Sequence, residues 1–197
     1  MRKLLYIALL ALVIPSSDKI TDLYLPNGLK LILKEDDTVS SIGLSVFYNV
    51  GSHDDPDGQK GMAGLQRFIM QESGKYNKIN YSERNMRLEE ITDESKYRHT
   101  SDLMYFSHEF SPRWFDEIVD IESQGHSTID VTDNSLERAK RAMIADGDEI
   151  YSDERTKHNS YPEGHPYKFH RWGDTLHIKS ISVDDAIDFR KRYINPN

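Results

Sequence analysis

The sequence predicts an α+β domain, with a largely antiparallel or mixed sheet and helices packed on one face of it. Short β-type runs come first, and two of them are joined by Asn27-Gly28, a dipeptide typical of tight hairpins. From Met62 onward, apolar residues recur every three or four positions, as they do in amphipathic helices. One more strand-like run, residues 103–110, lies between helical stretches without a regular β-α alternation. This order indicates an antiparallel sheet rather than a parallel one.

Residues 1–17 are predicted to be a signal peptide. A cationic start, Arg2-Lys3, precedes an apolar run over residues 4–14, and Pro15-Ser16-Ser17 ends it. That run is shorter than the roughly 20 residues of a membrane span. A buried N-terminal helix is the alternative, although the run has no polar stripe. We therefore expect a secreted, periplasmic protein with a domain over residues 18–197 and no membrane span after leader cleavage.

Alternation of side chains predicts the strands that follow. Residues 22–26 and 29–34 are expected to pair as a hairpin, and residues 42–50 alternate apolar with small or polar side chains. Residues 51–61 are rich in Gly, Asp and Pro, which is typical of a loop.

Apolar spacing and capping residues predict the helices. Ser111-Pro112 has the Ser cap and first-turn Pro of a helix start, and Ser182 is followed three residues later by Asp185. The predicted helices begin at residue 62 and at residue 112, and cover residues 81–91, 133–151 and 182–193.

Composition excludes several classes of function. The 197 residues include 25 Lys and Arg against 33 Asp and Glu, a net charge of −8. Such a chain is poorly suited to nucleic acid or to an anionic membrane surface, which both require basic residues. The absence of cysteine excludes disulfides, thiolate nucleophiles and Cys-ligated metals. No two of the 8 histidines form an i, i+4 pair on a predicted helix, so we expect the histidines and acids to lie on the surface.

Several stretches, taken in order, resemble one family over residues 22–197: 25–29 (LPNGL), 46–52 (VFYNVGS), 61–65 (GMAGL), 161–167 (YPEGHPY), 182–185 (SVDD) and 193–197 (YINPN). Together they are similar to the N-terminal domain of the pitrilysin/insulinase zinc metallopeptidases, which include the mitochondrial processing peptidase. The resemblance implies a half-domain of that fold. It also implies a further apolar strand after residue 197, so the half-domain is expected to be short at its C-terminal end.

The same resemblance implies a zinc motif, H-x-x-E-H, on the helix that starts near Met62. In the family, two His bind the metal, the Glu acts as base, and a Glu on a later helix completes the site. Here Gly64 and Phe68 stand at the two His positions, Arg67 at the base, and Ala145 at the downstream Glu. None of these side chains can ligate zinc or accept a proton from water. We therefore expect no catalytic residue of the family type, no metal ligand and no cofactor.

Peptide binding could persist without catalysis. The family binds extended substrate along an edge strand, and residues 97–102 are the equivalent stretch here. Thr100 and Ser101 are retained and are the candidate peptide-binding residues, whereas Tyr97 and Arg98 replace the family's Asn-Ala pair.

The leading hypothesis is a non-catalytic homologue that acts as a partner subunit or as a peptide-binding half. Its partner would be a zinc-bearing peptidase subunit or a second family domain, and an extended peptide is a possible ligand. Two alternatives remain: an active zinc metalloendopeptidase with displaced ligands, or a truncated or decayed peptidase gene product.

Overall fold

A computed structural model describes residues 20–73, 80–127, 130–158 and 161–194, with backbone only for residue 127 and residues 148–158. The predicted signal peptide lies outside the described residues. The described residues form two compact units, one within residues 20–39 and a main unit within residues 40–194.

The first unit contains the predicted hairpin. Strands β1 (Ile20–Tyr24) and β2 (Lys30–Lys34) pair antiparallel, with Tyr24 opposite Lys30. Gly28 has a φ of +90°, a conformation that glycine adopts readily, and its N–H donates to the carbonyl of Leu25. The Asn27-Gly28 prediction is therefore confirmed.

The main unit contains an antiparallel sheet in the order β3-β5-β4. Its strands are β3 (Ile42–Tyr48), β4 (Glu94–His99) and β5 (Met104–Phe110). One face of the sheet lies toward the helices. On β5 this face carries three buried side chains, those of Met104, Phe106 and Phe110. On the opposite face the hydroxyls of Ser45 and Ser107 lie 2.8 Å apart across two strands.

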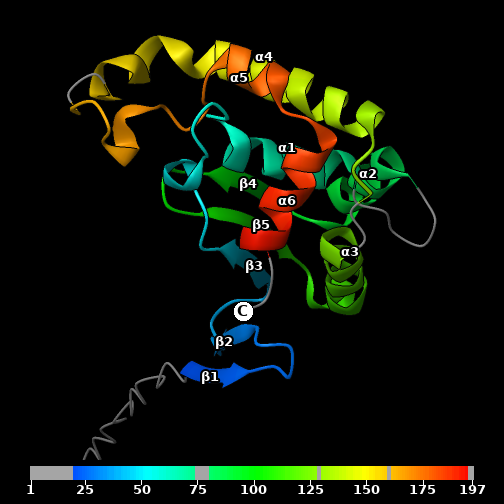
Figure 1. The fold of residues 1–197 in the computed structure, drawn as a ribbon. Coiled ribbons are helices and arrows are strands. Elements are labelled where there is room, and N and C mark those ends of the chain that lie inside the picture. Colours follow the sequence, from blue (N-terminus) through cyan, green and yellow to red (C-terminus); the bar gives the residue numbers. More distant parts are fainter. Residues whose placement is uncertain (1–19, 74–79, 128–129, 159–160, 195–197) are drawn as a thin grey trace, which may run out of the picture. The chain divides into compact units, whose positions relative to one another are not determined.

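Helix α1 (Met62–Ser73) lies between this sheet and α4 (Asp133–His158), as Figure 1 shows. Because it is covered on both sides, every residue from Met62 to Met70 is buried, including the polar Gln66 and Arg67. A helix buried on all faces is unusual for a surface element and marks α1 as the centre of the unit.

The other helices surround α1. They are α2 (Tyr81–Ile91), α3 (Phe115–Ser127), α5 (Thr175–Ser180) and α6 (Val183–Tyr193), with short 3₁₀ turns at Ser52–Asp54, Pro112–Trp114 and Pro166–Lys168. The predicted fold class, helices packed on a largely antiparallel sheet, is confirmed.

Helix starts agree with the sequence in part. Ser182 and Asp185 cap α6 reciprocally, as expected, since Ser182 accepts from the Asp185 N–H and Asp185 accepts from the Ser182 N–H. Ser111 makes no such bond with its side chain, and a 3₁₀ turn at Pro112 precedes α3. Helix α4 continues seven residues past the predicted end at Tyr151, to His158, and α5 was not predicted.

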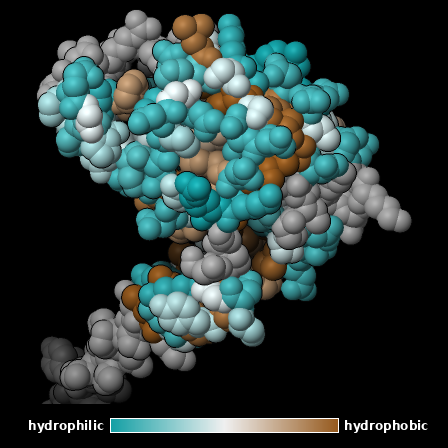
Figure 2. Space-filling view, in the orientation of Figure 1, coloured by the Kyte–Doolittle hydropathy of each residue, from teal (hydrophilic) through white to brown (hydrophobic). Residues whose placement is uncertain are grey.

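The main unit presents a largely hydrophilic face in the view of Figure 2, with hydrophobic residues visible between the helices. No helix in the described part of the chain is long and apolar enough to cross a membrane.

Candidate functional site

The start of α1 is held by a buried carboxylate. Asp55 accepts hydrogen bonds from the N–H groups of Gly61 and Ala63, both at 2.7 Å. Burial raises the pKa of Asp55 to about 7, although these two bonds and the charge of Lys60 oppose the rise. Gly61 has a φ of +105°, so the chain turns sharply into the helix. These contacts fix the start of α1, the helix that carries Gly64, Arg67 and Phe68.

Gly64, which the resemblance aligns with the first zinc ligand, lies where an added Cβ would crowd two side chains. A Cβ atom there would lie 2.8 Å from Nε2 of His99 and 2.8 Å from Cε of Met143. His99 comes from β4 and is 5% exposed, and burial lowers its pKa well below the usual value. An imidazole from the sheet and a thioether from α4 therefore fill the space beside Gly64.

Arg67, which the resemblance aligns with the family's catalytic base, is a buried cation. Its guanidinium carbon lies 3.8 Å from the ring centre of Phe68, and its Nη2 lies 3.5 Å from a carboxylate oxygen of Asp146. Nη1 donates to Oε1 of Gln71 at 3.1 Å and to the carbonyl of Tyr97 at 3.4 Å. Burial lowers the pKa of Arg67 to about 10, so it remains protonated at neutral pH.

Aromatic rings complete the surroundings of this cation. Trp172 packs at 4.6 Å, ring centre to ring centre, from His99 and at 6.0 Å from Phe68. We call Arg67, Phe68, His99 and Trp172 the Arg67 cluster. Sequence reasoning did not find His99 or Trp172, because each comes from an element distant in the chain and no local spacing relates them to α1.

Helix α4 meets the Arg67 cluster through residues other than Ala145. Met143 is buried against Gly64, Asp146 pairs with Arg67, and Gly147 packs against Trp172. Ala145 itself is exposed.

The Arg67 cluster does not fit a zinc ion. It offers one imidazole, and a guanidinium lies beside it where a divalent cation would be repelled. Among the residues whose placement is described, no group of three His, Cys, Asp or Glu side chains is arranged to hold a metal.

Thr100 and Ser101 lie in the turn between β4 and β5. The hydroxyl of Thr100 accepts from the N–H groups of Asp102 and Leu103 and donates to the carbonyl of Leu103. The carbonyl of Ser101 accepts from the N–H of His53 at 3.0 Å. The structure thus places both residues in the turn that ends β4, with the Thr100 hydroxyl already engaged.

In the described part of the chain, β4 is an edge strand that pairs with β5 on one side only. The Thr100 N–H donates to the Leu103 carbonyl. In an antiparallel pair, residues that bond to the neighbouring strand alternate with residues whose N–H and C=O point away from that strand. Ser95, Tyr97 and His99 therefore direct their backbone groups away from β5. The bond from Arg67 to the Tyr97 carbonyl agrees with this register.

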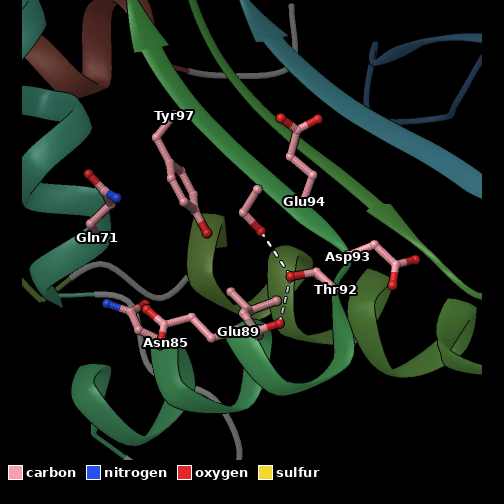
Figure 3. A pocket seen from close by; sticks show the side chains of 9 residues that line it. Gln71, Asn85, Glu89, Thr92, Asp93, Glu94 and Tyr97 are labelled. Carbon is pink, nitrogen blue, oxygen red and sulfur yellow. Dashed lines mark hydrogen bonds between the residues drawn. The ribbon is translucent and has the colours of Figure 1, made fainter.

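A pocket of about 360 Å³ lies beside this edge. Figure 3 shows Tyr97 pointing into it from β4, with Gln71 of α1 and Asn85 of α2 on the helical side. The remaining lining residues are Leu88, Glu89, Thr92, Asp93, Glu94 and Ser95. Most of the residues that line the pocket are polar, and three of them are acidic.

A second polar cluster is buried between the sheet and α3. Glu122 lies 2.8 Å from Nε2 of His126 and 3.4 Å from Nε2 of His108. Tyr48 and Ser95 contact the outer nitrogens of the two imidazoles, at 2.7 and 2.8 Å. Burial opposes ionisation of Glu122, but the hydrogen bonds and charges of both histidines outweigh it and lower its pKa. The expectation that histidines and acids lie on the surface is therefore wrong for this cluster.

Comparison with known proteins identifies the fold as that of a pitrilysin-type half-domain. No family model and no curated protein sequence matches the chain. Solved structures do match. Pitrilysin matches 91% of this chain with a TM-score of 0.79 and 16% sequence identity. A protease from Helicobacter pylori also matches 91% of this chain, with a TM-score of 0.76 and 16% sequence identity. The periplasmic protease PqqL from Escherichia coli matches 92% with a TM-score of 0.78 and 11% identity.

These similarities confirm the predicted fold. At such low identity they show the fold alone. The chain spans 44% of the Helicobacter protein, 20% of pitrilysin and 21% of PqqL, less than half of each.

Proposed function

We propose that this chain is a secreted, periplasmic, non-catalytic half-domain of the pitrilysin type that binds extended peptide and pairs with a zinc-bearing subunit or second domain. One observation supports the proposal: the guanidinium of Arg67, the residue that the resemblance aligns with the family's catalytic base, is buried and packed on Phe68. A guanidinium at that position would repel zinc and cannot act as a base toward water.

The open edge of β4 supports peptide binding. Strand addition uses backbone donors and acceptors, which Ser95, Tyr97 and His99 direct away from β5. The polar pocket beside the edge leaves room for alternate side chains of an added strand. In this proposal Thr100 and Ser101 act by fixing the end of β4.

The coverage of the neighbouring structures supports a partner. This chain corresponds to less than half of each matched protein, and those proteins therefore contain further structure beside the matched part. One of them is a periplasmic protease, which agrees with the predicted export. A zinc-bearing half would complement a half that binds peptide without metal.

Metal analysis and a cleavage assay test the loss of catalysis. We expect the purified protein to contain much less than one zinc per chain and to cleave no peptide, with or without chelator. Stoichiometric zinc together with chelator-sensitive cleavage would establish an active enzyme with displaced ligands instead. A chain that fails to fold cooperatively would support a decayed gene product.

N-methylated peptides test strand addition without altering the protein. Methylation of every second amide removes either the N–H groups that face β4 or those that face solvent. We expect one of the two isomeric peptides to bind like the unmodified peptide, and the other to bind at least about tenfold more weakly, since several backbone bonds are lost. Equal binding of both isomers would contradict this mode. Co-purification with a zinc peptidase subunit tests the partner separately.

A further inference from the structure

We infer that Arg67 is a binding site for a peptide carboxylate, and that Asp146 occupies this site in the free protein and is exchanged for the ligand. The inference rests on the proposed function for the peptide, but the site itself is argued from the Arg67 cluster. In this inference, the residue that the resemblance aligns with the family's catalytic base recognises a carboxylate of the peptide.

The charge of Arg67 is incompletely balanced. Its side chain is 8% exposed, and the one carboxylate paired with it in the described structure, Asp146, lies at 3.5 Å with 55% of its side chain exposed. Its other polar partners, the Gln71 amide and the Tyr97 carbonyl, are neutral. A buried guanidinium gains most from a bidentate carboxylate, which this ion pair at 3.5 Å does not provide.

Two buried N–H donors of the Arg67 cluster lack an acceptor in the described structure. Within the described residues, Nε of Arg67 and Nε1 of Trp172 are buried without a hydrogen-bond acceptor, and both residues are only 6% exposed. Both atoms are obligatory N–H donors. After burial, the charges of Arg67 and Arg171 also lower the pKa of His99, so two cations act on the same imidazole. An anion satisfies these groups, whereas a cation does not.

The position of Arg67 gives a peptide access to it. Its Nη1 already donates to the Tyr97 carbonyl, one of the backbone groups that β4 directs away from β5. A strand added at β4 therefore passes beside the guanidinium. The carboxylate can come from the C-terminus of the peptide or from an Asp or Glu side chain.

Asp146 can leave the site readily. Because more than half of its side chain is exposed, it regains water when it separates from Arg67. The exchange replaces a partly solvated carboxylate by one that the peptide holds in place. Removing the negative charge of Asp146 should therefore strengthen binding, and removing the positive charge of Arg67 should abolish it.

Trp172 is a reporter for this exchange. The chain has two tryptophans, so a Trp114→Phe background leaves Trp172 as the one fluorophore of its type. In this background the protein is titrated with acetate and with one short extended peptide in three forms: free acid, C-terminal amide, and amide with an internal Glu. We expect the free acid and the Glu peptide to bind at least about tenfold more tightly than the amide, and acetate to change the Trp172 emission weakly.

Two substitutions with opposite effects decide the outcome. Asp146→Asn should tighten binding of the free acid several-fold, and Arg67→Gln should weaken it at least tenfold. Glu137→Gln, on the same helix and paired with Lys140 instead, should change nothing. Because Asp146 is exposed, its variant stays informative even if Arg67→Gln fails to fold.

The possible results separate this inference from the proposed function. If the amide binds as tightly as the acid and Asp146→Asn has no effect, the carboxylate site is refuted while peptide binding stands. If acetate changes Trp172 emission in an Arg67-dependent way and no peptide binds, the anion site stands and the proposed function fails. A Trp172 signal unaffected by acetate, acid or Glu peptide would overturn the inference.

Discussion

The Nε2 atom of His99 lies 2.8 Å from the point where a Cβ on Gly64 would stand. This contact joins the central helix α1 to the edge strand β4 at the position that the resemblance aligns with the first zinc ligand. A side chain at residue 64, including a histidine that would restore that motif, crowds both His99 and Met143 and requires a shift there.

Gly64→Ala should therefore destabilise the protein. The added methyl group would overlap His99 and Met143, and overpacking of this kind costs about 1–3 kcal/mol. Urea unfolding measures the change as a lower midpoint with an unchanged slope. Gly43→Ala on β3, where a Cβ meets nothing within 4 Å, is the matched control. An equal effect at both positions would show that glycine flexibility, and not the His99 contact, is responsible.

Glu122→Gln should destabilise the protein strongly at neutral pH. Removing one member of a buried charged group costs about 3–5 kcal/mol, because both histidines lose their anionic partner. Glu117→Gln, which breaks a more exposed ion pair with Arg87, should cost at most about 1 kcal/mol.

The Glu122 contribution should also depend on pH in a defined direction. Its folded pKa lies below the ordinary value of 4.5, so the stabilisation is complete above pH 4.5 and is lost as pH falls toward the folded pKa. The difference between wild type and Glu122→Gln should shrink in acid below that pH. A constant difference down to pH 3, measured by urea unfolding, would contradict a lowered pKa.

The contribution of Asp55 to stability should change with pH in the opposite direction, over a different pH range. Its pKa is raised from 3.8 to about 7, so its folded form binds a proton that the unfolded chain has already released. Stability should fall as pH rises from about 4 to 7, by at most about 1.4 kcal/mol per pH unit. Asp55→Asn should lack this slope. If both proteins show the same slope, another group is the source.

Thr100→Val should lower the free energy of unfolding by about 1–3 kcal/mol, since two backbone N–H groups lose their acceptor in the turn. Ser101→Ala is the control and should stay within about 0.5 kcal/mol of wild type. The affinity for an extended peptide is measured on both variants. Reduced affinity with unchanged stability would show that the Thr100 hydroxyl contacts the ligand directly.

Several features of the fold could be predicted from sequence because they depend on neighbours in the chain. The Asn27-Gly28 hairpin, the range of α2 and the reciprocal cap of α6 depend on backbone conformation and on residues three or four positions apart. The order of motifs also predicted the pitrilysin-type fold that the solved structures confirm.

Other features could not be predicted, because they join residues far apart in sequence. The buried cluster of His108, Glu122 and His126 arises where α3 packs on β5, and alternation along one strand cannot show which helix covers it. The Ser111-Pro112 pair predicted a helix start, but the Ser111 side chain makes no capping bond and Pro112 begins a 3₁₀ turn before α3.

The sequence by itself predicted most of the elements, and it has Gly64 and Phe68, which cannot bind a metal, where the resemblance implies zinc ligands. Only the tertiary structure decided what replaced them. His99 and Trp172 reach Arg67 from distant elements, and Asp146 pairs with it from α4. The reason is physical: packing brings together groups that chain connectivity keeps apart, and the burial and charge of Arg67 follow from that packing.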